Sequence, residues 1–322
     1  MSDHSFTAYH IYYHNEKKTD LLISEVIQPF MKKHQDCVWF FIRYWEGGPH
    51  LRLRVSLRLD EHMPVLIQDL QTFMERHPSP EVFREDYYVK QKELTGLFED
   101  VNDLPWYEDR SVIKSPYVRE TRKYGGISGV KASEWYFHQS SILAVAVMRS
   151  TYEDYLSRLS AAFDVMLITA SGLGITTDEW MPYFQGYADF WEKYLGRDYN
   201  DVTSKSKELY TLNQEHIVRR MRKAVDAESQ GTRSNVLYQQ WHRISRRLLS
   251  EYEDIYQRGE LYCPLIGNKV KNRSDFHDAM GSICMAHIHM TNNRLGIIYH
   301  EEFILAEFIC KALEVLRTKP IA

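Results

Sequence analysis

Arginines and a histidine alternate along a short segment near residue 50, and their chemistry is the most informative in the chain. The segment reads Pro-His-Leu-Arg-Leu-Arg over residues 49–54, and Arg58 continues the alternation. Alternate side chains of a strand share one face, so His50, Arg52 and Arg54 point one way and the leucines between them face a core. A guanidinium binds a carboxylate or phosphate through two parallel hydrogen bonds. The pattern indicates either an anion site or a solvated sheet face whose arginines pair with acidic residues.

The residues before this segment predict its partner strand. Phe-Ile-Arg-Tyr occupies residues 41–44, and Gly47-Gly48 separates the two runs. A Gly-Gly pair between two such runs is typical of a β-hairpin. If the turn is centred on these glycines, Arg43 lies opposite Arg52. Like charges directly opposite destabilise a strand pair, so this register requires an anion or acidic partners.

His289, late in the chain, is the second candidate for chemistry. On a helix it shares a stripe with Asp278 and Ser282, whereas His287 points elsewhere, so the two histidines are not a natural metal pair. Ser282 lies about 10 Å away along the helix axis, beyond hydrogen-bond reach, which excludes a Ser–His–Asp triad. His289 is therefore either a structural histidine or a general acid or base.

Two clusters of basic residues fall on predicted helices. They comprise Arg219, Arg220, Arg222 and Lys223, and then Arg243, Arg246 and Arg247. Each cluster is either a solvated helix face or a contact for an acidic peptide or a tRNA-bearing partner. The sequence has no glycine-rich phosphate loop of the Walker or dinucleotide type.

The first third of the chain predicts strands and helices in alternation. Strands are expected over residues 5–14, 37–45, 50–57 and 111–124, and helices over 21–33 and 63–76. Residues 85–109 are irregular and acidic, which indicates a strand followed by a long excursion.

After residue 128 every periodic segment predicts a helix. Helices are expected over 133–148, from Thr151 with Asp154 as a cap, over 181–194 after Thr176 and Glu179, and over 204–227, 235–256, 274–292 and 300–316. This switch predicts an α+β fold with a mostly antiparallel N-terminal sheet and a predominantly helical C-terminal part. We expect one domain over residues 1–322, sheet-rich over 1–127 and helical over 128–322.

Composition narrows the class of protein. The 322 residues carry a net charge of −4, and the four cysteines form no C-x-x-C pair. The first 14 residues lack the pattern of a signal peptide, and no apolar run is long enough to span a bilayer. We therefore expect a cytoplasmic protein in a reducing environment, with no membrane contact, disulfide framework, metal or organic cofactor.

Four sequence patches, in order, resemble one known family. They are residues 41–54, Tyr-Val-Arg-Glu-Thr-Arg-Lys-Tyr-Gly-Gly over 117–126, Ser-Glu-Trp-Tyr-Phe-His-Gln-Ser-Ser over 133–141, and His-Met-Thr-Asn-Asn-Arg over 289–294, with Glu302 beyond. The sequence is similar to the thiopeptide-type bacteriocin biosynthesis domain, which also forms the C-terminal elimination part of class I lantibiotic dehydratases. The patches span nearly the whole chain.

The resemblance implies a lyase of antibiotic biosynthesis. A partner enzyme uses glutamyl-tRNA to esterify Ser or Thr of a ribosomally made precursor peptide, and the elimination domain removes glutamate to leave dehydroalanine or dehydrobutyrine. The matched positions imply that His289, Arg54 and Arg52 are catalytic. The substrate-binding residues would be Arg43, His50, Lys123, Tyr124, Arg294 and Ser282. The resemblance leaves open whether His289 acts as base or acid.

Two other functions stay open. Lys123 stands where the family usually has Arg, which keeps the charge but loses the bidentate fork. Stand-alone pyridine synthases of thiopeptide pathways resemble the same domain and join two dehydroalanines by a formal [4+2] aza-cycloaddition, expelling the leader peptide. Ser282, Tyr124 and His289 suit that reaction too. The third function is a non-catalytic scaffold that binds the leader peptide. A homodimer is also open.

Overall fold

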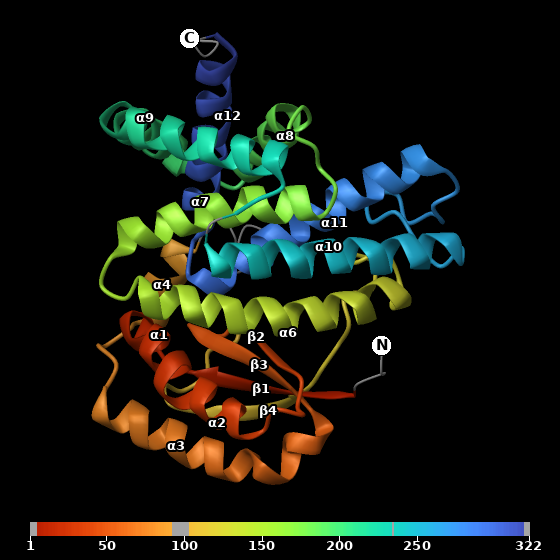
Figure 1. Ribbon diagram of the computed structural model, residues 1–322. Helices are drawn as coiled ribbons and strands as arrows, with labels where there is room; N and C mark the ends of the chain where they lie inside the picture. The colour runs from red at the N-terminus through yellow and green to blue at the C-terminus, as the bar shows by residue number, and fades with distance from the viewer. Residues whose placement is uncertain (1–4, 92–102, 234, 319–322) are drawn as a thin grey trace. The chain divides into compact units, whose positions relative to one another are not determined.

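The first part of the chain forms a four-stranded antiparallel sheet in the computed structural model, which describes residues 5–91, 103–233 and 235–318 (Figure 1). The strands are β1 (Phe6–Tyr12), β2 (Trp39–Tyr44), β3 (His50–Ser56) and β4 (Val112–Pro116). Their order is β2-β3-β1-β4. The three strands expected before residue 58 are confirmed, whereas the strand expected over 111–124 ends at Pro116.

The alternation in β3 separates a core face from a polar face. Leu51, Leu53 and Val55 are buried on the core face, and the strands contribute Tyr9, Ile11, Trp39 and Phe41 to the same hydrophobic cluster. Burial of one such leucine side chain stabilises the fold by about 1.5–3 kcal/mol. The helical members of the cluster are Leu22, Ile23, Ile27, Phe30, Met31, Leu59, Met63, Leu66, Leu70, Phe73, Met74, Val145 and Met148.

The hairpin between β2 and β3 forms at the predicted glycines but in a different register. Gly47 and Gly48 have φ of 93° and 101°, a region that favours glycine. Arg43 lies opposite Leu51, and Ile42 lies opposite Arg52. The register predicted from a turn centred on Gly47-Gly48 was wrong by one residue. A slip of one moves a side chain to the other face, so Arg43 lies on the core face.

Side chains close the free edge of β2. His138 Nδ1 lies 2.9 Å from the carbonyl oxygen of Trp39 and 3.2 Å from its backbone nitrogen, and the Phe41 N–H donates to Ser141 Oγ at 3.4 Å. Further along, Asn293 accepts from the Arg43 N–H at 2.8 Å and donates to the Arg43 carbonyl at 2.9 Å. An open strand edge is a site for unwanted pairing, and these bonds satisfy it.

The N-terminal helices are η1 (Glu16–Lys18), α1 (Thr19–Leu21), the π-helical η2 (Leu22–Ile27), α2 (Gln28–Lys33), η3 (Leu57–His62), α3 (Met63–Arg76) and α4 (Arg84–Lys90). Helices η2, α2, η3 and α3 pack on the core face, whereas Tyr87 and Tyr88 of α4 lie in a separate cluster with Leu104. The helices expected over 21–33 and 63–76 are confirmed. The strand expected after residue 85 was wrong, because residues 84–90 form a helix. Glu85 and Asp86 lie in its first turn and Lys90 lies in its last turn, so their charges complement the helix dipole. Residues 92–102 of the expected excursion lie outside the described residues.

The remaining chain is helical, as expected for the α+β class. The helices are α6 (Ile127–Ser150), α7 (Tyr155–Gly172), α8 (Trp180–Glu192), η5 (Gly196–Asp198), α9 (Tyr199–Gln230), α10 (Val236–Gln257), α11 (Arg273–Leu295) and α12 (Tyr299–Thr318). No helix among the described residues is long and apolar enough to cross a membrane.

Two helix starts test the predicted caps. Asp154 caps α7, because its carboxylate accepts from the Ser157 N–H at 3.0 Å. Thr151 does not open this helix; its hydroxyl donates to the Val147 carbonyl at the end of α6. Before α8, the Thr176 N–H and hydroxyl both donate to Glu179 at 2.8 Å, which confirms the predicted pairing.

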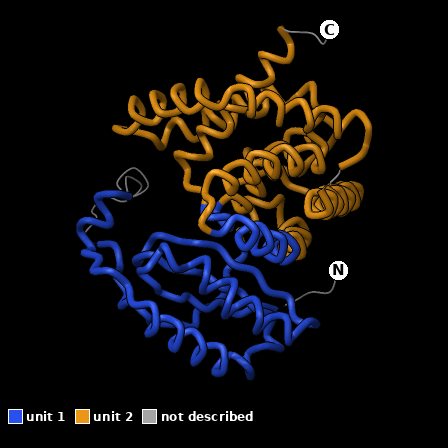
Figure 2. The backbone as a smooth tube through the Cα atoms, turned by 60° about the vertical axis from the view of Figure 1, so that its left-hand side comes forward, with its two compact units in different colours: residues 1–119, 137–152, 293–296 blue, residues 120–136, 153–292, 297–322 orange. Residues whose placement is uncertain are grey.

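The chain divides into two compact units (Figure 2). Unit 1 comprises Met1–Arg119, Phe137–Tyr152 and Asn293–Gly296, and unit 2 comprises Glu120–Tyr136, Glu153–Asn292 and Ile297–Ala322. Unit 1 therefore holds the sheet, and α6 and α11 each contribute residues to both units.

Candidate functional site

The polar face of the sheet gathers the predicted arginines in unit 1. His10 of β1 lies opposite Arg52, and Ala8 lies opposite Arg54. His10, His50, Arg52 and Arg54 share this face, which we call the arginine face. Arg58 does not join them, because β3 ends at Ser56 and η3 follows.

Arg52 is held in place by aromatic and imidazole groups. Its Nε donates to His50 Nε2 at 3.2 Å, and its guanidinium carbon lies 3.4 Å from the centre of the Tyr44 ring. Among the described residues no carboxylate forms an ion pair with Arg52. A stacked, orientated guanidinium of this kind has its remaining N–H groups ready for an external anion.

The two histidines of the face are uncharged at neutral pH. Burial, together with smaller contributions from the neighbouring Arg52 and Arg54, lowers the pKa of His50 to about 3. Burial also lowers the pKa of His10 to about 4, again with Arg52 and Arg54 contributing. Because His50 Nδ1 lies 2.9 Å from the Gly48 carbonyl, the neutral ring donates there and accepts from Arg52. The positive charge of the face therefore comes from its arginines.

Arg54 is partly buried beside aromatic rings. Its guanidinium donates to the Arg52 carbonyl at 3.0 Å and lies 6.0 Å from the ring centres of both Phe40 and Tyr117. Contacts with aromatic rings on a neighbouring strand and on the loop after β4 fix the direction of this side chain.

Arg43 lies apart from the arginine face. It forms an ion pair with Asp20 at 2.5 Å and donates to the Arg294 carbonyl from both Nε and a terminal nitrogen. Arg294 is buried, and its guanidinium lies 5.3 Å from the centre of the Phe137 ring. These contacts tie the end of α11 to β2 within unit 1. The local geometry of both arginines is therefore that of structural residues.

His289 belongs to a second cluster, built in unit 2 by α8, α11 and α12. Its Nδ1 lies 2.8 Å from Glu302 Oε1. Glu302 is fully buried and also accepts from the Tyr187 hydroxyl and, at 3.1 Å, from Asn292. Burial raises the pKa of Tyr187 well above its usual value, and the Glu302 charge raises it further, so Tyr187 retains its proton and donates it.

This cluster orientates the imidazole. The side chain of His289 is 30% exposed, and its ring centre lies 4.8 Å from that of Trp191. With Nδ1 bonded to Glu302, Nε2 is the nitrogen available for proton transfer. A base whose second nitrogen is held by a buried carboxylate has the arrangement expected for general acid–base catalysis.

The other expected substrate-binding residues have mixed environments in unit 2. Lys123 is half-buried, 3.7 Å from Glu120, and Tyr124 is buried with its ring centre 5.3 Å from that of His287. Ser282 is half-buried on α11, two turns before His289. His287 is fully buried with Nε2 3.1 Å from Ser133, which agrees with the prediction that it points away from His289.

Sequence reasoning did not assign roles to several residues of the two clusters. Glu302 was noted only as following the last motif, and Tyr187, Trp191, Asn292 and Tyr44 were not singled out. The helical spacing predicted over residues 300–316 could have indicated Glu302, because it places this acidic residue on the inward face of the helix. Among the described residues, no group of three or more His, Cys, Asp or Glu is arranged to hold a metal.

Fold and sequence together define the class of protein. The chain belongs to the family described as the lantibiotic biosynthesis dehydratase C-terminal domain, whose family model matches residues 7–313. The predicted resemblance is confirmed. A search of curated proteins gives no match.

Three solved structures are similar in fold. The pyridine synthase TbtD from thiomuracin biosynthesis gives a TM-score of 0.76 at 19% identity, covering 98% of this chain and 99% of that chain. TsrL gives 0.63 at 18% identity, covering 98% and 96%. The tRNA-dependent lantibiotic dehydratase MibB from Microbispora sp. 107891 gives 0.53 at 16% identity, covering 98% of this chain and 29% of that chain. At 16–19% identity, these three likenesses are likenesses of fold.

Proposed function

We propose that this protein eliminates glutamate from glutamylated Ser or Thr residues of a precursor peptide. The observation that carries the proposal is the arginine face, where Arg52 is stacked on Tyr44 and has no acidic partner among the described residues. A guanidinium with no acidic partner among those residues is suited to an acidic substrate group, and a glutamyl ester supplies a free carboxylate. The peptide would be esterified by a glutamyl-tRNA-dependent partner enzyme.

The reaction needs a base more than an acid. A base takes the Cα proton, the Cα–Cβ double bond forms, and the Cβ–O bond breaks as its electron pair leaves with the ester oxygen. Glutamate departs as a stable carboxylate and needs no proton, because an α-carboxyl has a pKa of about 3.5. The Cα–H bond is the harder one to break. We therefore assign His289 Nε2 the role of base, with Glu302 stabilising the imidazolium that forms.

The arginines serve the developing negative charge. Arg52 and Arg54 would bind the free side-chain carboxylate of the glutamyl group and stabilise the charge that moves onto the leaving ester oxygen. His50, Lys123, Tyr124 and Ser282 would bind substrate, as the family motifs imply, whereas Arg43 and Arg294, also expected there, have the structural contacts described above. Of these, His50 has the most direct support, because it accepts the Nε–H of Arg52.

The test is incubation with a synthetic glutamylated peptide, followed by mass spectrometry. Wild type should release glutamate and leave dehydrated peptide. Arg52→Ala and Arg54→Ala should each slow the reaction by about 10²–10³-fold, because each removes a donor that faces the developing charge. Fully dehydrated product at the wild-type rate from both variants would exclude the arginine face from the reaction.

Pyridine synthesis is the second candidate, and one observation favours it. The fold of TbtD matches this chain over nearly the whole length of both chains. A peptide bearing two dehydroalanines, incubated in parallel, separates the candidates. Loss of mass corresponding to cyclisation and leader expulsion would favour the synthase. If neither peptide changes, a leader-binding scaffold is the remaining function.

A further inference from the structure

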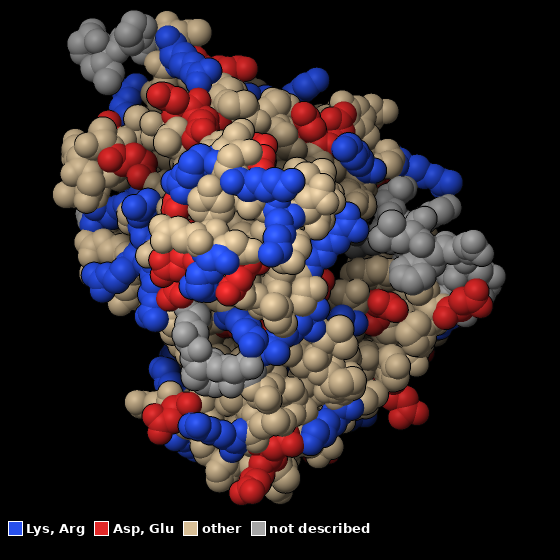
Figure 3. All heavy atoms as spheres, turned by 90° about the vertical axis from the view of Figure 1, so that its right-hand side faces the viewer, with Lys and Arg blue, Asp and Glu red and all other residues tan. Residues whose placement is uncertain are grey.

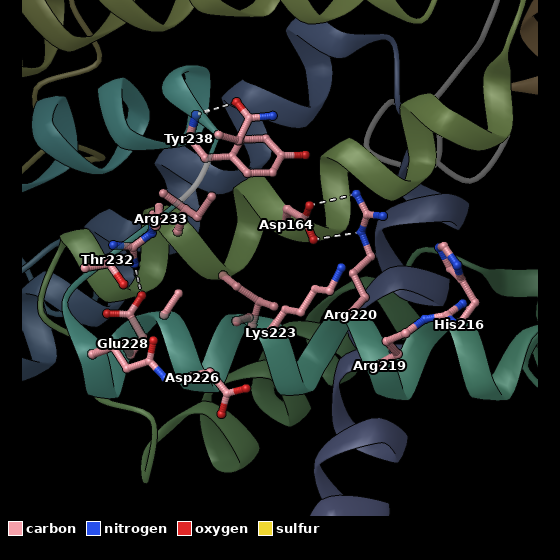
Figure 4. A pocket seen from close by; sticks show the side chains of 16 residues that line it. Asp164, His216, Arg219, Arg220, Lys223, Asp226, Glu228, Thr232, Arg233 and Tyr238 are labelled. Carbon is pink, nitrogen blue, oxygen red and sulfur yellow. Dashed lines mark hydrogen bonds and ion pairs between the residues drawn. The ribbon is translucent and has the colours of Figure 1, made fainter.

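A cavity of about 580 Å³ lies between α7, α9 and the start of α10, within unit 2 (Figure 4). Leu167 and Ile168 of α7 are buried and form an apolar floor, to which Ala224 and Ala227 of α9 contribute. None of these residues belongs to the arginine face or to the His289 cluster. The cavity is large enough for a few side chains of a bound peptide.

Basic side chains of α9 line one end of this cavity. His216, Arg219, Arg220 and Lys223 recur at the spacing that places side chains on one helix face. They include part of the first basic cluster of the sequence, for which a solvated face was the alternative interpretation. Like charges four residues apart, as in Arg219 and Lys223, destabilise an isolated helix. The stability of α9 therefore does not explain why these like charges gather beside a cavity.

One of these arginines is already neutralised by the protein. Arg220 donates to both carboxylate oxygens of Asp164, at 2.8 and 2.7 Å. Tyr238 of α10 lines the same wall, and Figure 4 shows the three side chains together. Because Asp164 neutralises Arg220 and fixes its side chain, Arg220 is part of the cavity wall and does not serve as a cationic site for a ligand.

Arg219 and Lys223 differ from Arg220. Both are exposed, and among the described residues neither forms an ion pair. Both line the same cavity as the apolar side chains of Leu167 and Ile168. Their charges are therefore available to a ligand that carries carboxylates and an apolar group.

The far end of the cavity limits the kind of ligand. Asp226 and Glu228 line it, and Glu228 pairs with Arg233. A nucleic acid carries phosphates along its whole length, and such acids would repel it. The face of the molecule drawn in Figure 3 mixes Lys and Arg with Asp and Glu. A short peptide with acidic and apolar residues fits the mixture of charges and the apolar floor.

We propose that this cavity docks an acidic peptide segment, with its carboxylates on Arg219 and Lys223 and an apolar side chain on Leu167 and Ile168. The identity of the natural ligand rests on the proposed function: it is a segment of the precursor peptide outside the residues that react. The docking site is separate from the chemistry, so binding is measured without turnover.

The experiment is fluorescence anisotropy of the full chain with a short labelled peptide that carries a single Glu-Glu-Leu segment. The double variant R219E/K223E should bind about tenfold more weakly, because two attractive contacts become repulsive. The matched control R222E/K207E reverses two exposed charges of the same helix that do not line the cavity, and it should change affinity less than about twofold. Affinity of the wild type should also fall as salt rises.

Two further arms decide between ligand chemistries. A Gln-Gln-Leu peptide should bind weakly, because it lacks the carboxylates. An RNA oligonucleotide of matched charge should bind no more tightly than the acidic peptide. Equal loss in the two double variants would overturn the docking site, and preferential RNA binding that R219E/K223E abolishes would replace the peptide with a nucleic acid. A failed elimination assay with intact peptide binding would count against the proposed function alone.

Discussion

At the scale of residues, the proposed function rests on how two side chains are held by their neighbours. Arg52 is fixed by His50 and Tyr44, and His289 is fixed by Glu302. In both cases the supporting group is buried or half-buried. The orientation of the reactive group is therefore set before substrate arrives, which is the condition for efficient charge stabilisation and proton transfer.

Glu302→Gln should lower the rate constant of elimination by about 10²-fold with little change in KM. The amide keeps the shape of the side chain but cannot stabilise an imidazolium charge on His289. Steady-state kinetics on the glutamylated peptide measure the two parameters. Glu253→Gln, which removes an exposed ion pair with Arg273, is the control and should be silent. An unchanged rate in Glu302→Gln would show that His289 needs no carboxylate.

The neutral histidines of the arginine face predict a pH dependence of stability. Below pH 6.5 the unfolded chain binds protons at His10 and His50, while the folded chain, with pKa values of about 4 and 3, does not. The free energy of unfolding should therefore fall as pH drops from 6.5 toward 4. Urea unfolding at several pH values measures the slope.

His50→Gln isolates this contribution, because carboxylates elsewhere in the chain also titrate on the acid side. Its free energy of unfolding should fall less steeply than that of wild type between pH 6.5 and 4. Parallel slopes for the two proteins would mean that His50 is not buried in its neutral form.

At the scale of elements, α6 and the end of α11 complete the sheet. Their side chains occupy the hydrogen-bonding positions that a fifth strand would fill beside β2. The strand that carries Arg43 and Tyr44 is thereby fixed against sliding. Because Tyr44 stacks on Arg52, the closed edge also supports the arginine face.

Asn293→Ala should destabilise the protein by about 1–3 kcal/mol, because it leaves the N–H and carbonyl of Arg43 without their partner. Urea unfolding at pH 7 gives the change. Asn213→Ala removes only an exposed bond to the Leu209 carbonyl on α9 and is the matched control. A loss no larger than that of the control would mean that the β2 edge does not depend on Asn293.

At the scale of the whole molecule, two compact units share two helices along the chain. The sheet and its helices form one hydrophobic cluster in unit 1, while α6 and α11 continue into unit 2. A helix forms and melts cooperatively, so loss of packing in unit 1 should spread along α6. The division into units therefore does not imply independent stability.

Leu53→Ala should lower the free energy of unfolding by about 2–5 kcal/mol, because Leu53 is fully buried in the cluster. Hydrogen exchange with mass spectrometry should show faster exchange in β1 and β3 and also in the unit 2 part of α6. Val65→Ala, at an α3 position that is 58% exposed, should change stability by less than about 0.5 kcal/mol. Acceleration confined to unit 1 would show that the units open separately.

Much of this protein could be predicted from local sequence patterns. Side-chain periodicity is a short-range property, so the sequence alone predicts the α+β class, the hairpin glycines, the bounds of α3 and the common face of His50, Arg52 and Arg54. The family motifs likewise distinguish His289 from the other histidines, because each motif is one contiguous stretch of the chain.

Only tertiary structure decided the partners of these residues. A register shift of one residue removed Arg43 from the arginine face, and the sequence pattern around the turn is compatible with either register. Glu302 lies on a different helix from His289, beyond the chain reversal at Gly296, whose φ is 77°. Tyr187 and Asn292 meet Glu302 from two more helix positions. Periodicity specifies which way a side chain faces on its own element, whereas contacts between distant elements depend on how the helices pack.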